Sequence, residues 1–323
     1  MKFLLTLVFC STLALSMAQG PYAPAAGQPG SNAIHMDSSL IVDWASVCTV
    51  NRGWVNMADT SLGKVTVGED HFATGKSNLY GVASLGDGGE AVIRFNGLLF
   101  DGIGPDFAIF ENSFSDNFLE LAFVEASSDG KNFYRFPSHS LSDTTQQVGS
   151  FGFTEATMIH NFAGKYRWGF GTPFDLADLA NIPGLDIQRI SHLRVIDVVG
   201  SIDSAYVNRD SQGRPINDPF PTPFPSGGFD LDGVAAIHIN SVGLSEDILA
   251  SRLRIFPNPT DDIVNIEANA LHLEEFQLYN YQGKLIQRGA FNGKIDLSTL
   301  DSGVYLLSFS SEQQFITKRI VKR

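Results

Sequence analysis

The feature that most constrains the fold of this chain is a series of short apolar runs with alternating character, separated by glycine-rich turns. Residues 107–111 read Phe-Ala-Ile-Phe-Glu, and in a β-strand every second side chain points to the same face. Phe107, Ile109 and Glu111 then share one face. With 31 glycines and 25 phenylalanines in 323 residues, this pattern predicts an all-β fold rather than a helical one.

The length of the chain suggests two folded units. A positive charge at Lys2, an apolar run and the triplet Ser16-Met17-Ala18 are typical of an export signal. The stretch that follows is rich in Pro, Gly and Ala, so we expect it to be flexible. We therefore expect a signal peptide at 1–18, a flexible leader at 19–33, a jelly-roll-like β-sandwich at 34–243, a linker at 244–252 and a small β-sandwich at 253–323.

The formal net charge of -13 makes nucleic-acid binding an unattractive function for this chain. An acidic surface with many aspartates fits an extracellular protein that meets calcium. The apolar run at the N-terminus is too short to span a bilayer comfortably, so we expect no transmembrane segment in the mature chain.

From residue 253 onward, seven short runs separated by turn signals predict a small sandwich of the immunoglobulin or fibronectin III kind. This segment carries the motifs Phe256-Pro257-Asn258-Pro259-Thr260, Leu278-Tyr279-Asn280 and Asp301-Ser302-Gly303-Val304-Tyr305, and the basic end Lys318-Arg319-Ile320-Val321-Lys322-Arg323. In the order of these motifs it resembles the type A sorting domain of the type IX secretion system of Bacteroidetes. The resemblance implies that the type IX machinery is a partner, that the protein crosses the outer membrane, and that the tail is removed before surface attachment or release.

The main domain resembles a family of uncharacterised bacterial secreted and cell-surface proteins. The resemblance rests on segments such as Ser84-Leu85-Gly86-Asp87-Gly88-Gly89, Gly104-Pro105-Asp106-Phe107-Ala108-Ile109-Phe110-Glu111-Asn112 and Gly228-Phe229-Asp230-Leu231-Asp232. It brings no established activity. More distantly, the pattern of a strand followed by Asn is similar to surface cobalamin-binding proteins of Bacteroidetes.

Acidic side chains at strand ends are the first candidate site. Calcium takes six to eight oxygen ligands from carboxylates, amides and backbone carbonyls. The expected ligands are Asp106, Glu111, Asn112, Asp230 and Asp232, with Asp101 and Asp197 in reserve. The alternative is that Asp106 and Asp232 only cap turns and that Glu111 pairs with Arg94 or Arg194.

Alternating aromatic residues are the second candidate site. Tyr166, Arg167, Trp168 and Phe170 are the expected ligand-binding residues, because exposed rings can stack on sugars or on a large planar ligand. Tyr206, Phe220 and Phe224 could join them from a long proline-rich loop. The alternative is that these rings fix loops to the sandwich.

Catalysis has the weakest support in the sequence. Glu111, Glu120 and Glu125 could supply paired carboxylates for glycoside cleavage, but no Gly-x-Ser-x-Gly or His-Glu-x-x-His motif is present. We assign no catalytic residue. We expect a calcium-stabilised surface protein that binds a glycan or another extracellular small ligand, with cobalamin binding beside an outer-membrane transporter, or glycan hydrolysis, as alternatives.

Overall fold

The computed structural model describes residues 20–78, 81–240, 253–268, 273, 275–311 and 314–323. The expected signal peptide (1–18) and linker (244–252) lie wholly outside this part of the chain. Nearly all regular structure is β, as the alternation predicts, and the four helices are short 3₁₀ turns. These are η1 (Thr60–Leu62), η2 (Asp70–Ala73), η3 (Ala156–Met158) and η4 (Leu176–Leu179).

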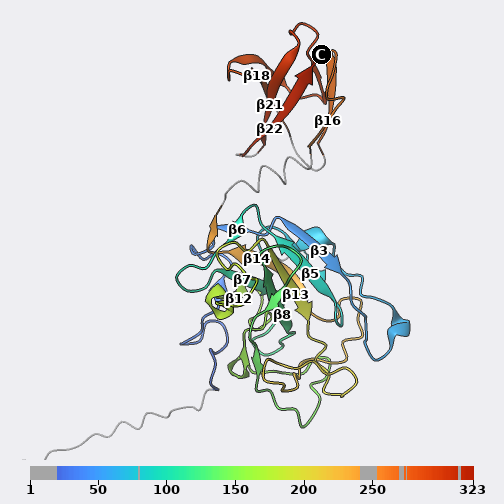
Figure 1. Cartoon of the computed structure of the whole chain (residues 1–323). Helices are drawn as coiled ribbons and strands as arrows, with labels where there is room; N and C mark the ends of the chain where they lie inside the picture. The colour runs from blue at the N-terminus through green and yellow to red at the C-terminus, as the bar shows by residue number, and fades with distance from the viewer. Residues whose placement is uncertain (1–19, 79–80, 241–252, 269–272, 274, 312–313) are drawn as a thin grey trace, which may run out of the picture.

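The main domain contains two antiparallel sheets (Figure 1). The first sheet has the order β1 (Ile34–His35), β12 (Phe170–Phe174), β7 (Phe107–Glu111), β14 (Asp230–Ala236) and β2 (Asp43–Trp44), and β4 (Ala83–Ser84) also pairs with β14. The second sheet has the order β3 (Val47–Asn51), β5 (Glu90–Arg94), β13 (His192–Asp197), β8 (Ala122–Ser127) and β9 (Tyr134–Arg135). Two small ribbons complete the domain: β10 (His139–Ser140) with β11 (Ile159–His160), and β15 (Ile239–Asn240) with β6 (Leu98–Leu99). The domain is therefore sandwich-like, as expected.

Strand β7 is buried on both faces, which explains why its sequence is apolar throughout. Phe107 and Ile109 belong to the large core cluster, where Phe107 stacks on Phe174 with ring centroids 5.3 Å apart. Ala108 and Phe110 belong to a second cluster on the other face. A carboxylate at the end of such a strand is forced into an apolar environment whichever face it points to.

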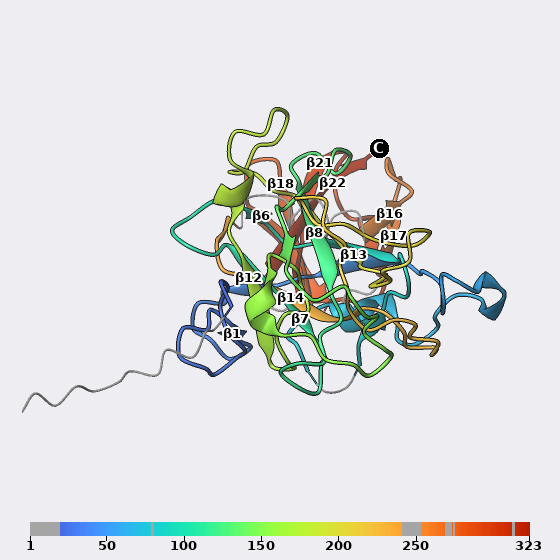
Figure 2. The same cartoon turned by 90° about the horizontal axis from the view of Figure 1, so that it is seen from below.

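The leader does not behave as its composition suggests. Residues 20–33 pack on the main domain (Figure 2). The Tyr22 amide donates to the Thr157 carbonyl at 3.2 Å, and Ala26 is only 3% exposed. The expectation of a flexible leader is therefore corrected for these residues, because their backbone groups and small side chains find partners on the domain.

The C-terminal unit is a separate small sandwich of seven strands. One sheet has the order β16 (Leu253–Phe256), β17 (Ile263–Ala268) and β20 (Lys294–Asp296), and the other has the order β19 (Leu285–Ala290), β18 (Glu275–Asn280), β21 (Gly303–Ser311) and β22 (Gln314–Lys322). The Asn258 side chain accepts from the Val321 amide at 2.9 Å and donates to the Arg319 carbonyl at 2.8 Å. The proline-flanked motif and the basic end of the chain thus hold each other in place.

Replacing Phe107 by Ala tests the core assignment. Because Phe107 is fully buried between Phe136 and Phe174, the substitution should lower the free energy of unfolding by about 3–5 kcal/mol. Urea denaturation of the full mature chain measures it. Val42→Ala, at a side chain 62% exposed, is the control and should change stability by less than about 0.5 kcal/mol. Equal effects of the two substitutions would contradict the assignment.

Candidate functional site

The candidate site is built at the end of β7, where this strand meets β14. Glu111 pairs with Leu231, while Phe110 pairs with Gly233, so Asp232 is an extra residue in the ladder. Such a β-bulge turns side chains away from the regular alternation. Asp230 pairs with Ser84 of β4 at the same place. The register therefore brings together two segments that lie about 120 residues apart in the sequence, as we expected. It sets Glu111 beside Asp230.

Glu111 is buried and lacks a cationic partner in the part of the chain that is described. It is 1% exposed; its Oε2 accepts from the Ser113 amide at 2.8 Å, and its Oε1 has no hydrogen-bond partner. The expected alternative, a pair with Arg94 or Arg194, is wrong, because Arg194 binds Glu125 instead. Burial, and next the charge of Asp230, raise the pKa of Glu111 well above its ordinary value.

Asp230, like Glu111, is a buried carboxylate with one oxygen that lacks a hydrogen-bond partner. It is 8% exposed and its Oδ1 has no hydrogen-bond partner. Burial raises the pKa of Asp230 to about 6, an effect that the side chains of Ser84 and Asn112 and the charge of Arg52 partly offset. Asn112 is thus close enough to Asp230 to act on it, as the predicted ligand set requires.

Further acidic groups, most of them outside the predicted ligand set, extend the site. Burial and the charges of Glu111 and Asp230 raise the pKa of Glu120 well above its ordinary value. Asp197 and Asp218 are each 2% exposed, as is Asp87, and burial raises the pKa of all three. We call the six residues that influence one another in this way the acidic row: Asp87, Glu111, Glu120, Asp197, Asp218 and Asp230.

In the described part of the chain, backbone amides hold three further members of the acidic row. Asp197 accepts from the amides of Phe229 at 2.8 Å and Gly88 at 3.0 Å. Asp218 accepts from the Leu121 amide at 2.9 Å, and Asp87 from the Met57 amide at 2.6 Å. Because a buried carboxylate is costly without a counter-charge, these groups must either keep protons or share a cation.

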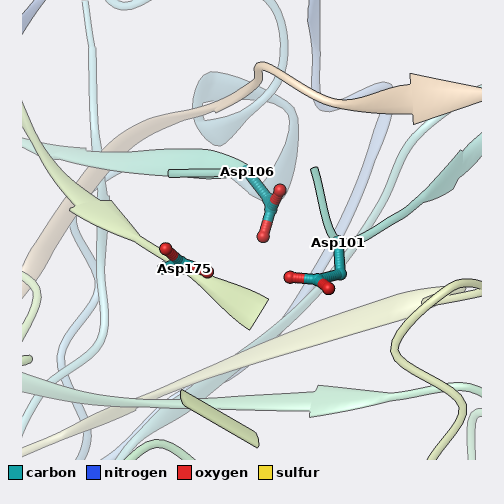
Figure 3. Close-up of side chains that lie close together, drawn as sticks. All are labelled: Asp101, Asp106 and Asp175. Carbon is teal, nitrogen blue, oxygen red and sulfur yellow. The ribbon is translucent and has the colours of Figure 1, made fainter. Parts of the chain in front are cut away.

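Asp106 lies at the opposite end of β7 and does not join this site. Its carboxylate accepts from the Gly102 amide at 2.8 Å, the Leu176 amide at 2.6 Å and His238 Nδ1 at 2.7 Å. Oxygens of Asp101, Asp106 and Asp175 lie within 4.8 Å of one another (Figure 3). Because three protein donors bind Asp106, we interpret its carboxylate as a cap on the turn at residue 102 and on η4. This agrees with the alternative that Asp106 only caps a turn.

Asp232 is also occupied by protein donors. It is fully buried, accepts from the Asn78 amide at 3.1 Å and accepts from the Ser77 hydroxyl. Of the five predicted metal ligands, the structure therefore brings together Glu111, Asn112 and Asp230 with oxygens to spare. It places Asp232 nearby, bound to Ser77 and Asn78, and leaves Asp106 elsewhere.

The aromatic candidates separate in a similar way. Tyr166 is 1% exposed and donates to Asn32, while Phe170 packs edge-on against His35 at 5.0 Å. These two rings fix the N-terminal segment to the domain. Trp168 has a different role: its amide donates to the Ser113 carbonyl at 2.8 Å, and its buried Nε1 has no hydrogen-bond partner.

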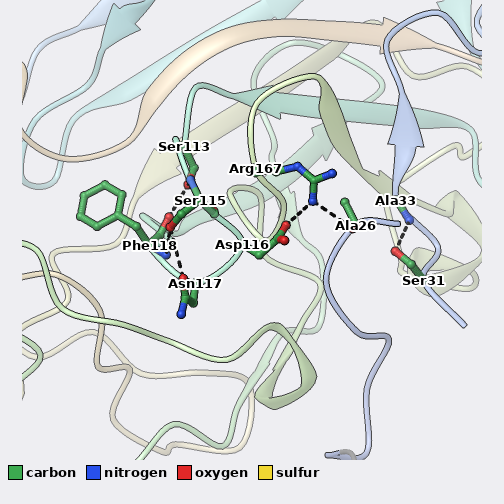
Figure 4. A network of polar contacts seen from close by, with 9 residues as sticks. All are labelled: Ala26, Ser31, Ala33, Ser113, Ser115, Asp116, Asn117, Phe118 and Arg167. Atoms are coloured by element: carbon green, nitrogen blue, oxygen red, sulfur yellow. Dashed lines mark hydrogen bonds and ion pairs between the residues drawn. The ribbon is translucent and has the colours of Figure 1, made fainter. Parts of the chain in front are cut away.

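A cavity of about 480 Å³ opens beside Trp168. Its lining includes Gly81, Val82, Asn112, Ser113, Arg167 and Trp168. Asn112 directly follows Glu111, so the cavity adjoins the acidic row through neighbouring residues of the chain. Arg167 binds Asp116 and donates to the Ala26 carbonyl at 2.9 Å, which holds the wall in place (Figure 4).

The raised pKa of Asp230 predicts a pH-dependent difference in stability. The folded-state pKa is about 6, against about 3.9 when unfolded. The folded state therefore holds the proton more tightly, and stability is lost as the pH rises from about 4 through about 6. We therefore compare the two proteins in a buffer that contains a metal chelator. Between pH 4 and pH 6, the free energy of unfolding of Asp230→Asn should rise by about 2 kcal/mol relative to that of the wild type.

Denaturant unfolding at several pH values measures the difference. Glu155→Gln, at an exposed glutamate, is the control and should stay parallel to the wild type. A constant difference between Asp230→Asn and the wild type from pH 4 to pH 7 would show that Asp230 does not carry this proton.

Comparison with known proteins characterises the C-terminal unit. Residues 254–323 match the family described as the secretion system C-terminal sorting domain. No curated protein matches the chain. In the part of the chain that is described, no helix has the length and apolar character needed to cross a membrane.

Solved structures give only distant likenesses. They include β-glucuronidases from Ruminococcus gnavus (10% identity, TM-score 0.20, 88% of this chain and 43% of that chain) and Lactobacillus rhamnosus (11% identity, TM-score 0.20, 86% and 44%). The chain spans less than half the length of these enzymes, and at such TM-scores the likeness carries no argument. The sorting-domain match alone gives an identity: this is a secreted protein whose C-terminal domain is a type IX sorting domain, which sends it to the cell surface or the extracellular space.

Proposed function

We propose that the main domain is a binding module that captures a glycan or another oxygen-rich small ligand in the cavity beside Trp168. The observation that carries the proposal is the wall of a cavity of about 480 Å³, where Trp168 lies beside the polar side chains of Asn112 and Arg167. An aromatic ring at the wall can pack against a ligand, and the polar side chains beside it can form hydrogen bonds with oxygen atoms of that ligand. Cavities of this volume are typical of small-molecule sites.

The composition of the wall supports capture rather than cleavage. Asn112 and Arg167 add further donors, and Asn112 also adds an acceptor. No carboxylate occurs among the described residues that line the cavity, whereas glycoside cleavage needs two carboxylates flanking the scissile bond. Binding is therefore the better proposal for this surface than hydrolysis.

We further propose that the module is stabilised by calcium held by Glu111 and Asp230, with Asn112 and Glu120 contributing. The support is the chemistry of the donor set: two nearly fully buried carboxylates with unpartnered oxygens, an amide, and a third carboxylate, Glu120, whose own pKa the first two raise. Calcium prefers such oxygen ligands and would supply the missing positive charge. In this proposal the tail is removed after export, and the module acts at the surface or free of it.

Binding depends on Trp168 in this proposal. Glycan-array screening of the mature chain, followed by calorimetry on the ligands found, tests it. Trp168→Ala should weaken binding at least about tenfold, since it loses a ring contact that, with the apolar area it buries, is worth more than about 1.4 kcal/mol. Trp168→Phe should lose less affinity because an aromatic ring remains at this position.

Tyr281→Ala is the matched control, because this ring is 76% exposed in the sorting domain. It should bind like the wild type. Unchanged affinity in Trp168→Ala would remove the cavity from the binding site.

Calcium should raise the melting temperature at pH 7 but not at pH 3.5, where the carboxylates are protonated. At a hundredfold excess over Kd, the gain of about 2.7 kcal/mol should move the midpoint by roughly 5–10 °C. Glu111→Gln and Asp230→Asn should lose the shift. Asp106→Asn should keep it, although its own starting stability is lower, because Asp106 lies at the other end of β7. Calcium-independent melting of the wild type would end the proposal.

A further inference from the structure

A row of phenylalanine rings leads away from the cavity across three loops. Phe114 stacks on Phe118 with centroids 4.6 Å apart, Phe118 on Phe151 at 6.2 Å, and Phe151 lies against Phe224 at 5.6 Å. We call Phe114, Phe118, Phe151 and Phe224 the phenylalanine ladder. The three loops lie far apart in the sequence, so only the fold brings their rings together.

The ladder is unusually open to solvent. Phe114 is 72% exposed, Phe151 is 66% exposed and Phe224 is 39% exposed, while Phe118 is the buried rung at 7%. Phe153, in the same loop as Phe151, is 67% exposed. Single exposed apolar side chains are ordinary, but a contiguous apolar patch on a secreted protein indicates a binding surface.

The three loops hold the ladder in a fixed arrangement. The Thr154 amide donates to the Asn117 carbonyl at 2.8 Å, which joins the first loop to the second. The Ser150 hydroxyl donates to the Pro221 carbonyl at 2.6 Å, which joins the second to the third. Within the first loop, Ser113 and Ser115 bind the backbone of Phe118 (Figure 4). A preorganised surface loses little entropy on binding.

The buried ring and the exposed rings of the ladder differ in what they can offer a ligand. Phe118 packs against Phe114 and Phe151, with ring centroids 4.6 and 6.2 Å away, and is only 7% exposed. Phe114, Phe151 and Phe224 remain exposed and are joined into one row by these contacts and by the contact between Phe151 and Phe224. An aliphatic chain can lie along such a continuous apolar row and cover several rings at once.

Phe114 connects the ladder to the cavity, because it also lines the cavity together with Arg167 and Trp168. We propose that the ligand is an amphiphile whose oxygen-rich head enters the cavity and whose aliphatic chain lies along the phenylalanine ladder. The proposal rests on the proposed function of the cavity and names the chemical class of its ligand. The head packs against Trp168 and bonds to the polar side chains of Asn112 and Arg167 in the cavity wall, and the chain covers Phe114, Phe151 and Phe224.

A series of n-alkyl glucosides from butyl to octyl, kept below their micelle concentrations, tests the proposal by calorimetry on the mature chain. For the wild type, affinity should rise about fourfold per added methylene. Phe114→Ser and Phe151→Ser should flatten this dependence; both rings are exposed, so folding is kept and is checked by the unfolding midpoint. Ile103→Ser, at a side chain 99% exposed outside the ladder, should keep it.

Trp168→Phe separates the ligand class from the function of the cavity. It should weaken every member of the series by a similar factor and leave the dependence on chain length unchanged. A flat chain-length dependence in the wild type, or an unchanged one in Phe151→Ser, overturns the amphiphile. If oligosaccharides bind through Trp168 while the ladder variants bind them normally and the dependence is flat, the proposed function stands and the ladder inference falls. A dimer that Phe151→Ser converts to monomer assigns the ladder to self-association and also overturns it.

Discussion

The burial of carboxylates without matching cations is the constraint on which the rest of the main domain depends. Five members of the acidic row are more than nine-tenths buried, and the described residues around them supply mostly backbone amides. The segments that carry them are strand ends and turns from several parts of the chain. Their packing is therefore stable only when the negative charge is removed or balanced, so protonation is coupled to the integrity of this end of the sandwich, as is cation binding in the calcium proposal.

Local pattern was sufficient to predict the strands, because alternation is a property of neighbouring residues. Both the all-β architecture and the inward orientation of Glu111 followed from residues 107–111. That the strand end carrying Glu111 meets the one carrying Asp230 could be anticipated from two acidic strand ends. The membership of Glu120 and Asp218 could not, since their proximity depends on how separate segments cross. Asp106 was grouped wrongly because a five-residue strand places its ends far apart.

In the proposed function, the loops at this end of the domain contact the ligand through one polar and one apolar surface. The polar surface is the cavity wall around Trp168, and the apolar surface is the phenylalanine ladder, with Phe114 shared by both. The sheets make this end of the domain rigid, and the acidic row requires that its negative charge be removed or balanced. The sorting domain has its own core, built around residues such as Leu278 and Leu307, so the main domain and the sorting domain rest on separate hydrophobic cores.

The N-terminal segment, residues 20–33, helps to hold two residues of the main domain in place. Ala26 and Asn32 supply the acceptors for Arg167 and Tyr166, the two residues that precede Trp168. Residues 20–33 thus act as a strap whose removal would leave a guanidinium and a buried phenol without these partners. A fusion or a truncation at this end would disturb the cavity wall by breaking these two hydrogen bonds, although the bonded residues lie more than 130 positions apart along the chain.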